Sequence, residues 1–453
     1  MRPLEFRFGT AGILAPVVLF LAGVIWLGLA GAPDERGFWP VLLAALALGL
    51  TLARDRRAYA EAAVAGAARP IVLLMIFAWM LAGVMAELMN ASGFVETLVA
   101  TASAAGLSGG MFVATAFLIC CAVSTSTGTS LGTILLCAPL LYPAAGDLAA
   151  DPRMLIGAIL AGATFGDNIS PVSDTTIASA TTQGAEMGQV VRSRLRYALP
   201  AGVFALLAFL GFGAGSAPDT SLAGIVRPDA DPLGWLLLAA PVLVVAMLLR
   251  GRHLIEGLFA GSVATIAIGL LTGRLQTGQL MYLDLEQFTA KGLIVSGVER
   301  AVGVSVFTIL LMALVAGLEA SGLLERWMTT AGRRVRSARG AELSIFGITS
   351  ACVLLTTHAV VAILTVGGVA RRLGERFAVG ANRRANLLDL TVSTYPFVLP
   401  WFIPTVLAAG MTGQAEGVPR LAVTQVGLFN FHSWALFAIA LIAMITGWGR
   451  RSG

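Results

Sequence analysis

A polar run with two carboxylates interrupts an apolar stretch of this chain. Residues 166–176 read Gly-Asp-Asn-Ile-Ser-Pro-Val-Ser-Asp-Thr-Thr, inside a segment (154–184) otherwise rich in Ile, Leu, Ala and Gly. An ionisable side chain in a membrane-spanning segment costs about 3 kcal/mol or more unless it faces protein or a watery cavity. Asp167 and Asp174 therefore indicate an ion or substrate path.

The same run predicts a cation site at a break between two helices. Because Gly and Pro interrupt helices and Ser, Asp and Thr cap them, we expect a helix to about Phe165, a break over 166–171 and a second helix from about Ser173. Oxygen-bearing side chains in and after the break belong to Asp167, Asn168, Ser170, Ser173, Asp174, Thr175 and Thr176. Such oxygens, with free backbone carbonyls, suit sodium. The sequence thus predicts transient sodium binding by Asp167 and Asp174.

These carboxylates are also suited to carrying a proton. Loss of water disfavours the charged form of a carboxylate, whereas a bound cation favours it. One site can therefore exchange one ion for the other. The alternative is that Ser173 or Asp174 only caps the second helix.

Other polar stretches interrupt apolar segments in the same way. Ser124–Ser130 lies midway along 109–146 and predicts a hairpin, or two half-helices, whose tip lines the same cavity through Thr127, Thr129 and Ser130. Single hydroxyls there could instead bond their own helix or join two helices. Segment 341–411 contributes Thr357, His358, Asp389, Ser393 and Thr394. His358 is interpreted equally well as a buried, satisfied histidine or as a proton relay.

Composition places these segments in a membrane. The chain has 453 residues, of which 57% are hydrophobic and 12% charged, and its mean hydropathy is +0.85. No water-soluble globular domain has this balance. Runs long enough to span a bilayer lie near 11–30, 38–54, 69–90, 195–213, 233–249, 254–273, 301–322 and 426–448. We therefore expect an all-α polytopic membrane protein.

The net charge of +5 comes from arginines in short loops, without interleaved aromatic residues. The positive-inside rule explains them and places both termini in the cytoplasm, while nucleic-acid binding is excluded as a function.

The cysteines lie in apolar segments without metal-ligand spacing; they are Cys120, Cys121, Cys137 and Cys352. We expect no disulfide, no metal cluster and no cofactor.

An internal repeat is predicted from residues 81–98 and 310–327. Ala91-Ser92-Gly93 with Glu96 matches Ala320-Ser321-Gly322 with Glu325, and the loop charges orient the two copies oppositely. Such inverted repeats, with interrupted helices and re-entrant hairpins meeting near the midplane, are the architecture of secondary transporters. We divide the chain into N-terminal spans (1–68), repeat 1 (69–200), connecting spans (201–299), repeat 2 (300–411) and a C-terminal span (412–453).

The run from Gly162 to Thr176 closely resembles the signature of NhaC-type sodium/proton antiporters, in the ion-transporter superfamily. The resemblance extends to Gly128–Thr133 and, more loosely, to Arg384–Trp401. It implies a transporter of the inner membrane, often a homodimer, that exchanges sodium for protons or couples the ion to an organic anion. This chain differs from the pattern at Asn168, where the family commonly has lysine, and at Phe402, where it has a polar residue.

Two functional hypotheses follow. The first is a sodium/proton antiporter working by alternating access, whose partners are the bilayer, sodium and protons. The second is a sodium- or proton-coupled transporter of a small organic solute, which a larger cavity between the breaks would favour. An intramembrane enzyme is not expected, because the chain has no HExxH motif and no paired-aspartate protease pattern.

Overall fold

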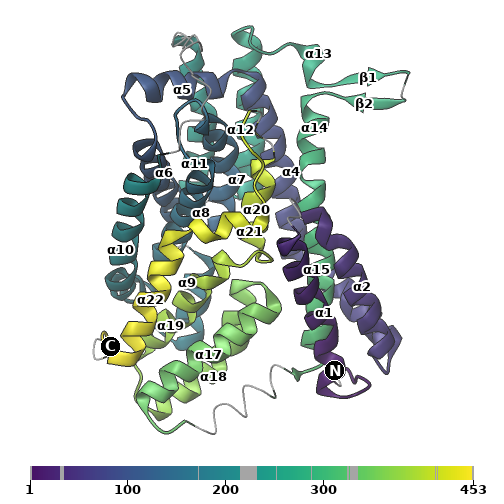
Figure 1. Cartoon of the computed structure of the whole chain (residues 1–453), viewed down its shortest axis with the longest axis vertical. Coiled ribbons are helices and arrows are strands. Elements are labelled where there is room, and N and C mark those ends of the chain that lie inside the picture. Colours follow the sequence, from purple (N-terminus) through teal and green to yellow (C-terminus); the bar gives the residue numbers. More distant parts are fainter. Residues whose placement is uncertain are drawn as a thin grey trace.

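A computed structural model describes residues 3–30, 35–171, 173–214, 232–250, 252–286, 288–323, 326, 335–413, 415 and 417–450. These residues are mostly helical and form an elongated bundle, with both chain termini at its lower end in Figure 1. In the described part of the chain, nine helices are long and apolar enough to cross a membrane, or ten if a bent pair near the C-terminus counts as one span.

The uninterrupted apolar runs form helices close to where the sequence predicts them. They are α1 (Thr10–Leu29), α2 (Phe38–Leu52), α4 (Pro70–Ala91), α10 (Met187–Phe212), η4 (Pro232–Leu238) with α11 (Ala239–Leu249), α12 (Leu254–Leu271), α15 (Val302–Ala320) and α22 (Phe431–Thr446). Shorter elements connect them: η1 (Glu35–Gly37), α3 (Arg56–Ala67), α5 (Phe94–Ala104), η2 (Tyr142–Ala145), α13 (Thr277–Leu280), α14 (Leu293–Arg300), α21 (Val423–Val426) and η6 (Gly427–Phe429).

The interrupted segments form pairs of helices separated by short breaks. The pairs are α6 (Gly110–Thr127) with α7 (Ser130–Leu141), α8 (Pro152–Ile169) with α9 (Asp174–Gln183), α17 (Ala338–Thr356) with α18 (Ala359–Arg376), and α19 (Ala381–Val392) with η5 (Tyr395–Val398) and α20 (Ile403–Thr412). In Figure 1, α6 and α7 lie in the upper half, whereas α17 and α18 lie low, on the side of the termini.

Two details differ from the sequence prediction. Helix α8 continues to Ile169 instead of ending near Phe165, because Gly166 is used as a contact surface for another helix rather than as a helix breaker. The expected all-α fold also contains a short antiparallel hairpin, β1 (Tyr282–Asp284) with β2 (Thr289–Lys291). Its strands are only three residues long, too short to show a hydrophobic period. Of the predicted repeat residues, Glu325 lies outside the described residues.

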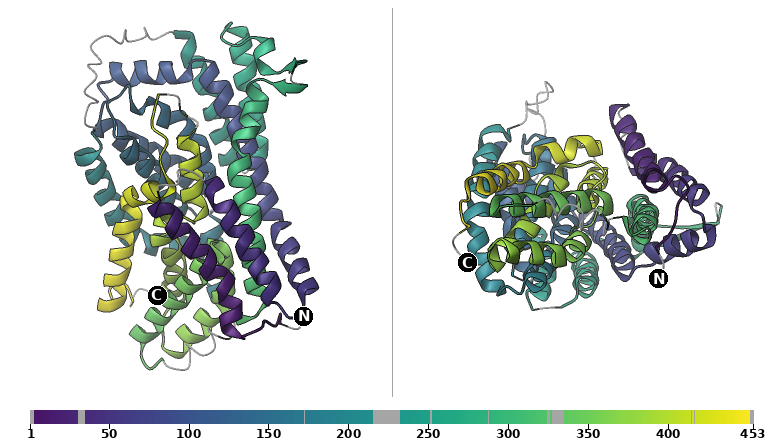
Figure 2. Two further views of the ribbon diagram at one scale, coloured as in Figure 1. Left: turned by 45° about the vertical axis from the view of Figure 1, so that its right-hand side comes forward. Right: turned by 90° about the horizontal axis from the view of Figure 1, so that it is seen from below.

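Helices α4 and α15 carry most of the two repeat-matched segments, and with α1, α2 and α14 they form a group beside the main bundle. Viewed from below, α1 and α2 stand to one side (Figure 2), and α4 packs along α14 and α15. A Cβ on Gly83 would lie 2.2 Å from the carbonyl oxygen of Gly297, so these two backbones are in direct contact. Ion pairs join the same helices near both ends, between Glu87 and Arg300 and between Arg69 and Glu319.

Helices α6 and α8 also cross at glycine. A Cβ on Gly162 would lie 2.5 Å from the Phe117 carbonyl oxygen, and one on Gly166 would lie 2.4 Å from the Thr125 nitrogen. Two small residues four apart on one helix face allow two backbones to approach this closely in membranes. The hydroxyl of Ser124 donates a 2.6 Å hydrogen bond to the Ala163 carbonyl across the contact. This crossing fixes the tip of the α6–α7 hairpin against the end of α8.

We predict that Gly166→Val destabilises the protein by roughly 1–3 kcal/mol, the usual cost of overpacking. The added side chain must displace backbone atoms of α6, which no rotamer change can avoid. Thermal unfolding in detergent measures the effect. Gly211→Val is the matched control, because a Cβ there meets nothing within 4 Å. Equal melting temperatures for the two variants would contradict the prediction.

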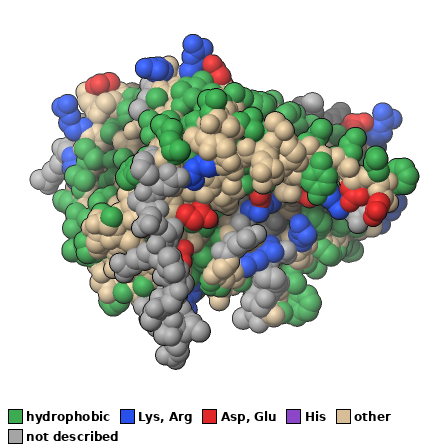
Figure 3. Space-filling model, turned by 90° about the horizontal axis from the view of Figure 1, so that it is seen from above, with side chains coloured by type: hydrophobic (Ala, Val, Ile, Leu, Met, Phe, Trp, Pro, Cys, Tyr) green, Lys and Arg blue, Asp and Glu red, His purple; other side chains and the backbone are tan. Residues whose placement is uncertain are grey.

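The outer surface suits lipid. Viewed from above, hydrophobic side chains make up much of the outline and charged side chains are scattered over the end face (Figure 3). Helix α10 alone exposes Leu199, Val203, Phe204, Leu207 and Leu210. An uninterrupted exposed apolar face of this kind is stable in hydrocarbon and unfavourable in water.

Candidate functional site

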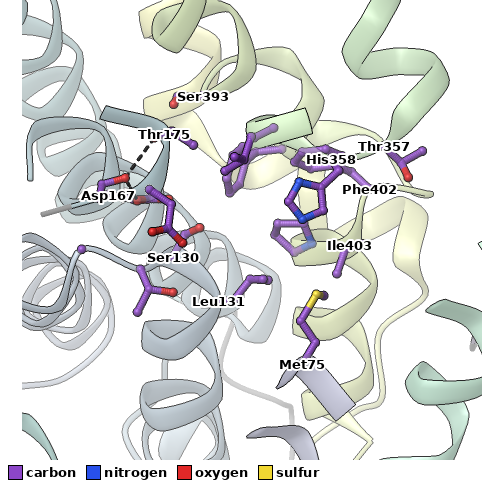
Figure 4. A pocket seen from close by; sticks show the side chains of 18 residues that line it. Met75, Ser130, Leu131, Asp167, Thr175, Thr357, His358, Ser393, Phe402 and Ile403 are labelled. Atoms are coloured by element: carbon purple, nitrogen blue, oxygen red, sulfur yellow. Dashed lines mark hydrogen bonds between the residues drawn. The ribbon is translucent and has the colours of Figure 1, made fainter. Parts of the chain in front are cut away.

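A cavity of about 110 Å³ lies where the helix breaks meet. Its lining comes from the α6–α7 tip, the α8–α9 break, the α17–α18 tip and the α19–α20 break, together with Met75 of α4. Figure 4 shows polar side chains, including Asp167, Ser130 and Thr175, on one side, and Met75, Ile403 and Phe402 on the other. Segments more than two hundred residues apart thus share one site.

Both hairpins turn at the cavity through a left-handed residue. Gly128 (φ 68°) ends α6 and Thr357 (φ 53°) ends α17. The following residue begins the next helix in each case: Thr129, whose hydroxyl accepts a 3.2 Å hydrogen bond from the Gly132 nitrogen, and His358. A β-branched residue such as Thr357 is uncommon in this conformation. The two tips therefore have the same local geometry, built from different residues.

Asp167 is the cavity carboxylate that residues of two helix breaks contact. It lies in the last turn of α8, and its Oδ1 accepts a 2.6 Å hydrogen bond from the Ser173 hydroxyl. Ser130, at the start of α7, presents its hydroxyl and its backbone nitrogen to the same carboxylate. The Ser173 hydroxyl also lies 3.0 Å from that of Thr175. Asp167 is only partly exposed, so its carboxylate is positioned by two breaks at once.

Asp389 belongs to a buried ion pair behind the cavity. Its Oδ2 lies 2.8 Å from Nη1 of Arg194, and both side chains are fully buried. Oδ1 accepts hydrogen bonds from Nδ2 of Asn168 (3.0 Å) and from the Ser393 hydroxyl (3.2 Å). Oδ2 accepts longer ones from the hydroxyls of Thr176 and Ser179, each 3.4 Å. Asp389 is therefore charge-compensated within the protein.

Arg194 joins three helices at this point. From α10 it donates to the Asn168 carbonyl at the end of α8 (2.5 Å), the Thr176 hydroxyl on α9 (2.8 Å) and Oδ1 of Asn386 on α19 (3.0 Å). Buried ion pairs are maintained only where hydrogen bonds complete the geometry. The Arg194 network thus fixes the two broken crossings relative to each other.

Most of the predicted site residues fall into two groups. Those lining the cavity are Thr129, Ser130, Asp167, Ser173, Asp174, Thr175, Thr357, His358 and Ser393. Asn168, Thr176 and Asp389 form the Arg194 network behind it. Ser170 is buried in the break, Thr394 donates to the Thr391 carbonyl, and Thr127 precedes the hairpin tip; none of these three is among the lining residues. Glu87 and Glu319 pair with arginines away from the cavity.

Sequence reasoning missed Arg194, which it assigned to a basic loop. The helix actually begins at Met187, and Val190, Arg194, Tyr197 and Ala201 are all buried on it. That spacing of three or four residues places them on one face of a helix. It was the signal in the sequence that Arg194 lies on a buried helix face. The apolar wall of Met75, Val360, Phe397 and Ile403 was not predicted either, because single apolar residues in a hydrophobic chain carry no signal.

In the described part of the chain, no group of three or more His, Cys, Asp or Glu side chains is placed to hold a metal ion. The oxygens present are instead single carboxylates, hydroxyls and helix-end carbonyls. Oδ1 of Asn168 is a further acceptor, buried without a hydrogen-bond partner among the described residues. Oxygen donors of this kind are typical of alkali-cation sites and not of transition-metal sites.

Residues 36–214, which contain the first hairpin and the α8–α9 break, match the model of the Na+/H+ antiporter family. An "Na(+)/H(+) antiporter NhaC" of Alkalihalophilus pseudofirmus is 30% identical over 202 residues, 44% of this chain and 42% of that protein. The resemblance to NhaC-type antiporters is confirmed, and the protein is a multi-pass membrane protein.

Two further relatives carry other names. A "Malate-2H(+)/Na(+)-lactate antiporter" of Bacillus subtilis is 26% identical over 52% of this chain and 53% of its own length. An "Arginine/ornithine antiporter ArcD" of Halobacterium salinarum is 26% identical over 76% of this chain and 72% of its own length. This chain spans about half the length of the NhaC antiporter and of the malate/lactate antiporter. The YdaH transporter structure of Alcanivorax borkumensis covers 97% of this chain and 99% of its own at 14% identity, with a TM-score of only 0.39.

Proposed function

We propose that this protein is a secondary antiporter that exchanges sodium for protons at Asp167 by alternating access. The observation that carries the proposal is the position of Asp167, at a helix break, beside the tip of a hairpin and lining the cavity. A carboxylate so placed binds either a cation or a proton, because each neutralises a charge that is costly to leave partly desolvated. Binding of one therefore displaces the other.

In the proposed cycle, the hydroxyls of Ser130 and Ser173 adjust to the state of Asp167. A hydroxyl both donates and accepts, so it donates to the bare carboxylate and turns its oxygen toward sodium when the ion is bound. Asp174 and Thr175, at the start of α9, and Thr129 complete an oxygen-lined wall. Asp389 does not take part in exchange, because Arg194 already compensates its charge.

Alternating access is proposed to arise from inverted repeats, 69–200 and 300–411. The matching left-handed tips at Gly128 and Thr357 support this. So do the crossed ion pairs: each copy starts at an arginine and has a glutamate near the end of its first helix, and each arginine pairs with the glutamate of the other copy. Reciprocal contacts of this kind are the mark of a two-fold arrangement. We place the protein in the inner membrane as a homodimer, as the resemblance implies, and both termini in the cytoplasm, as the loop charges imply.

The test is sodium-evoked proton movement in proteoliposomes. Vesicles containing the purified protein hold a pH gradient reported by a pH-sensitive dye, and sodium, lithium or potassium is then added outside. We expect a saturable response to sodium that protein-free vesicles lack and that a protonophore eliminates. Failure of all three cations to move protons in vesicles that hold their gradient would refute the antiporter proposal.

A second candidate function is coupled transport of a small organic solute. The observation that favours it is the cavity volume of about 110 Å³, since a single water needs only roughly 10–15 Å³. Two relatives bear the names of organic-solute antiporters. Uptake of radiolabelled organic solutes, with and without a sodium gradient, distinguishes this function from sodium/proton exchange alone.

A further inference from the structure

The cavity has two chemically different walls. Asp167, Ser173, Asp174, Thr175 and Ser130 form one of them. Facing them are the apolar side chains Met75, Val360, Phe397, Phe402 and Ile403, and Figure 4 shows Asp167 and Phe402 on opposite sides. A monatomic ion uses only the first wall. The second wall and the remaining volume are suited to an apolar group attached to the ion.

The charge of the lining is negative. The described lining residues include Asp167 and Asp174 but no lysine or arginine. Each of the four breaks brings one helix N-terminus and one C-terminus to the cavity, and the half-charges of these ends are opposite and of equal size. The helix dipoles therefore largely cancel. Arg194 and Asp389, behind the wall, cancel each other as well, so the two remaining carboxylates determine the sign.

The apolar wall contains two aromatic rings. The rings of Phe397 and Phe402 pack edge to face, with centroids 5.2 Å apart. The face of an aromatic ring attracts a cation and a short alkyl chain, and it repels an anion. Nδ1 of His358, also lining the cavity, is buried without a hydrogen-bond partner in the described part of the chain. With Thr357, it provides the polar groups on this side of the cavity (Figure 4).

We propose that the cavity binds a small organic cation, an ammonium group on a short alkyl body, with the charge at Asp167 and Asp174 and the alkyl body against Phe397 and Phe402. The inference rests on the proposed function, because the ammonium group takes the place proposed for sodium. An organic anion is disfavoured, since it would bring a third negative charge into a lining without a basic side chain. Organic cation and sodium therefore compete for one site.

Binding to the purified full-length protein in detergent tests this. Butylammonium and butyrate are the matched probes, with equal carbon number and opposite charge, and calorimetry and displacement of radioactive sodium are the readouts. We expect butylammonium to bind and to displace sodium competitively, and butyrate to do neither, with or without sodium. Butylammonium should also bind at least about tenfold more tightly than methylammonium, since each buried methylene contributes roughly fourfold.

Variants separate the two walls. Phe402→Ala should weaken butylammonium binding about tenfold and leave sodium and methylammonium binding within about twofold, whereas Asp174→Asn should weaken all three. If Phe402→Ala does not fold, the butylammonium-to-methylammonium ratio of the wild type decides the question. Normal sodium binding without butylammonium binding, or tighter binding of butyrate, would overturn this inference and leave the proposed function intact. Absence of sodium binding would instead refute the proposed function.

Discussion

Asp167→Asn is expected to reduce sodium-evoked proton movement to the rate of protein-free vesicles. The amide is nearly isosteric and keeps a hydrogen bond from Ser173, but it holds no proton for exchange and has no charge for sodium. Loss of a charged hydrogen-bonding partner alone costs roughly 1.5–3 kcal/mol, which weakens sodium binding roughly tenfold to a hundredfold. The dye assay in proteoliposomes measures the exchange rate directly.

The matched control for this substitution is Asp147→Asn. Asp147 is exposed and does not line the cavity, so the variant should transport at the wild-type rate. Asp174→Asn should lie between the two, because Asp174 lines the cavity while Asp167 is the carboxylate that Ser130 and Ser173 hold. An Asp167→Asn protein that still exchanges sodium for protons at wild-type rate would remove Asp167 from the mechanism.

Arg194→Gln has the largest expected effect on stability. It leaves the carboxylate of Asp389 fully buried without its ion-pair partner, and breaking a buried pair in this way typically costs about 3–5 kcal/mol. It also removes the donor that α10 extends to the end of α8 and to α9. We therefore expect a markedly lower melting temperature in detergent, and weak or absent transport.

A double variant tests whether the unpaired charge of Asp389 is the cause of the lost stability. Arg194→Gln with Asp389→Asn removes both charges, so it should recover a large part of the stability that Arg194→Gln alone loses. Arg194→Lys should be intermediate, because an ammonium group cannot reproduce the guanidinium geometry that contacts Asp389 and Asn386 together. If the double variant is less stable than either single variant, the two side chains do not act as a compensated pair. Asp389 would then again be considered an exchange site.

The sequence predicted the elements of this fold because they follow from local rules. Apolar runs of sufficient length become spanning helices, and clusters of Ser, Thr, Gly and Pro interrupt them, as Ser124–Ser130 and Gly166–Thr176 do. The position of Asp167 beside a break followed from the same rules. The exact extent of the break did not, since α8 continues through Gly166 to Ile169. Gly166 packs on α6, and a contact with another helix cannot be predicted from the sequence around Gly166 alone.

What could not be predicted depends on contacts between distant segments. Arg194 read as a loop charge because nothing near it in sequence is acidic and buried; its partner is Asp389, on another helix. The sequence predicts Asp389 as a site residue because it is a lone intramembrane carboxylate, and its ion pair with Arg194 is not visible in the sequence. The apolar wall at Phe397 and Phe402 likewise becomes visible only when the breaks are brought together. Which distant residues contact each other depends on the topology of the fold, and their spacing in the sequence does not show it.

The most direct test of the central claim is proton release on sodium binding. The purified protein, in weakly buffered solution with a pH indicator, is titrated with sodium chloride while bound radioactive sodium is counted in parallel. We expect protons to be released in proportion to the sodium bound. Raising the proton concentration should weaken sodium binding, and Asp167→Asn should abolish both effects. Sodium binding without proton release, at every pH at which the protein is folded, would contradict exchange at a single carboxylate.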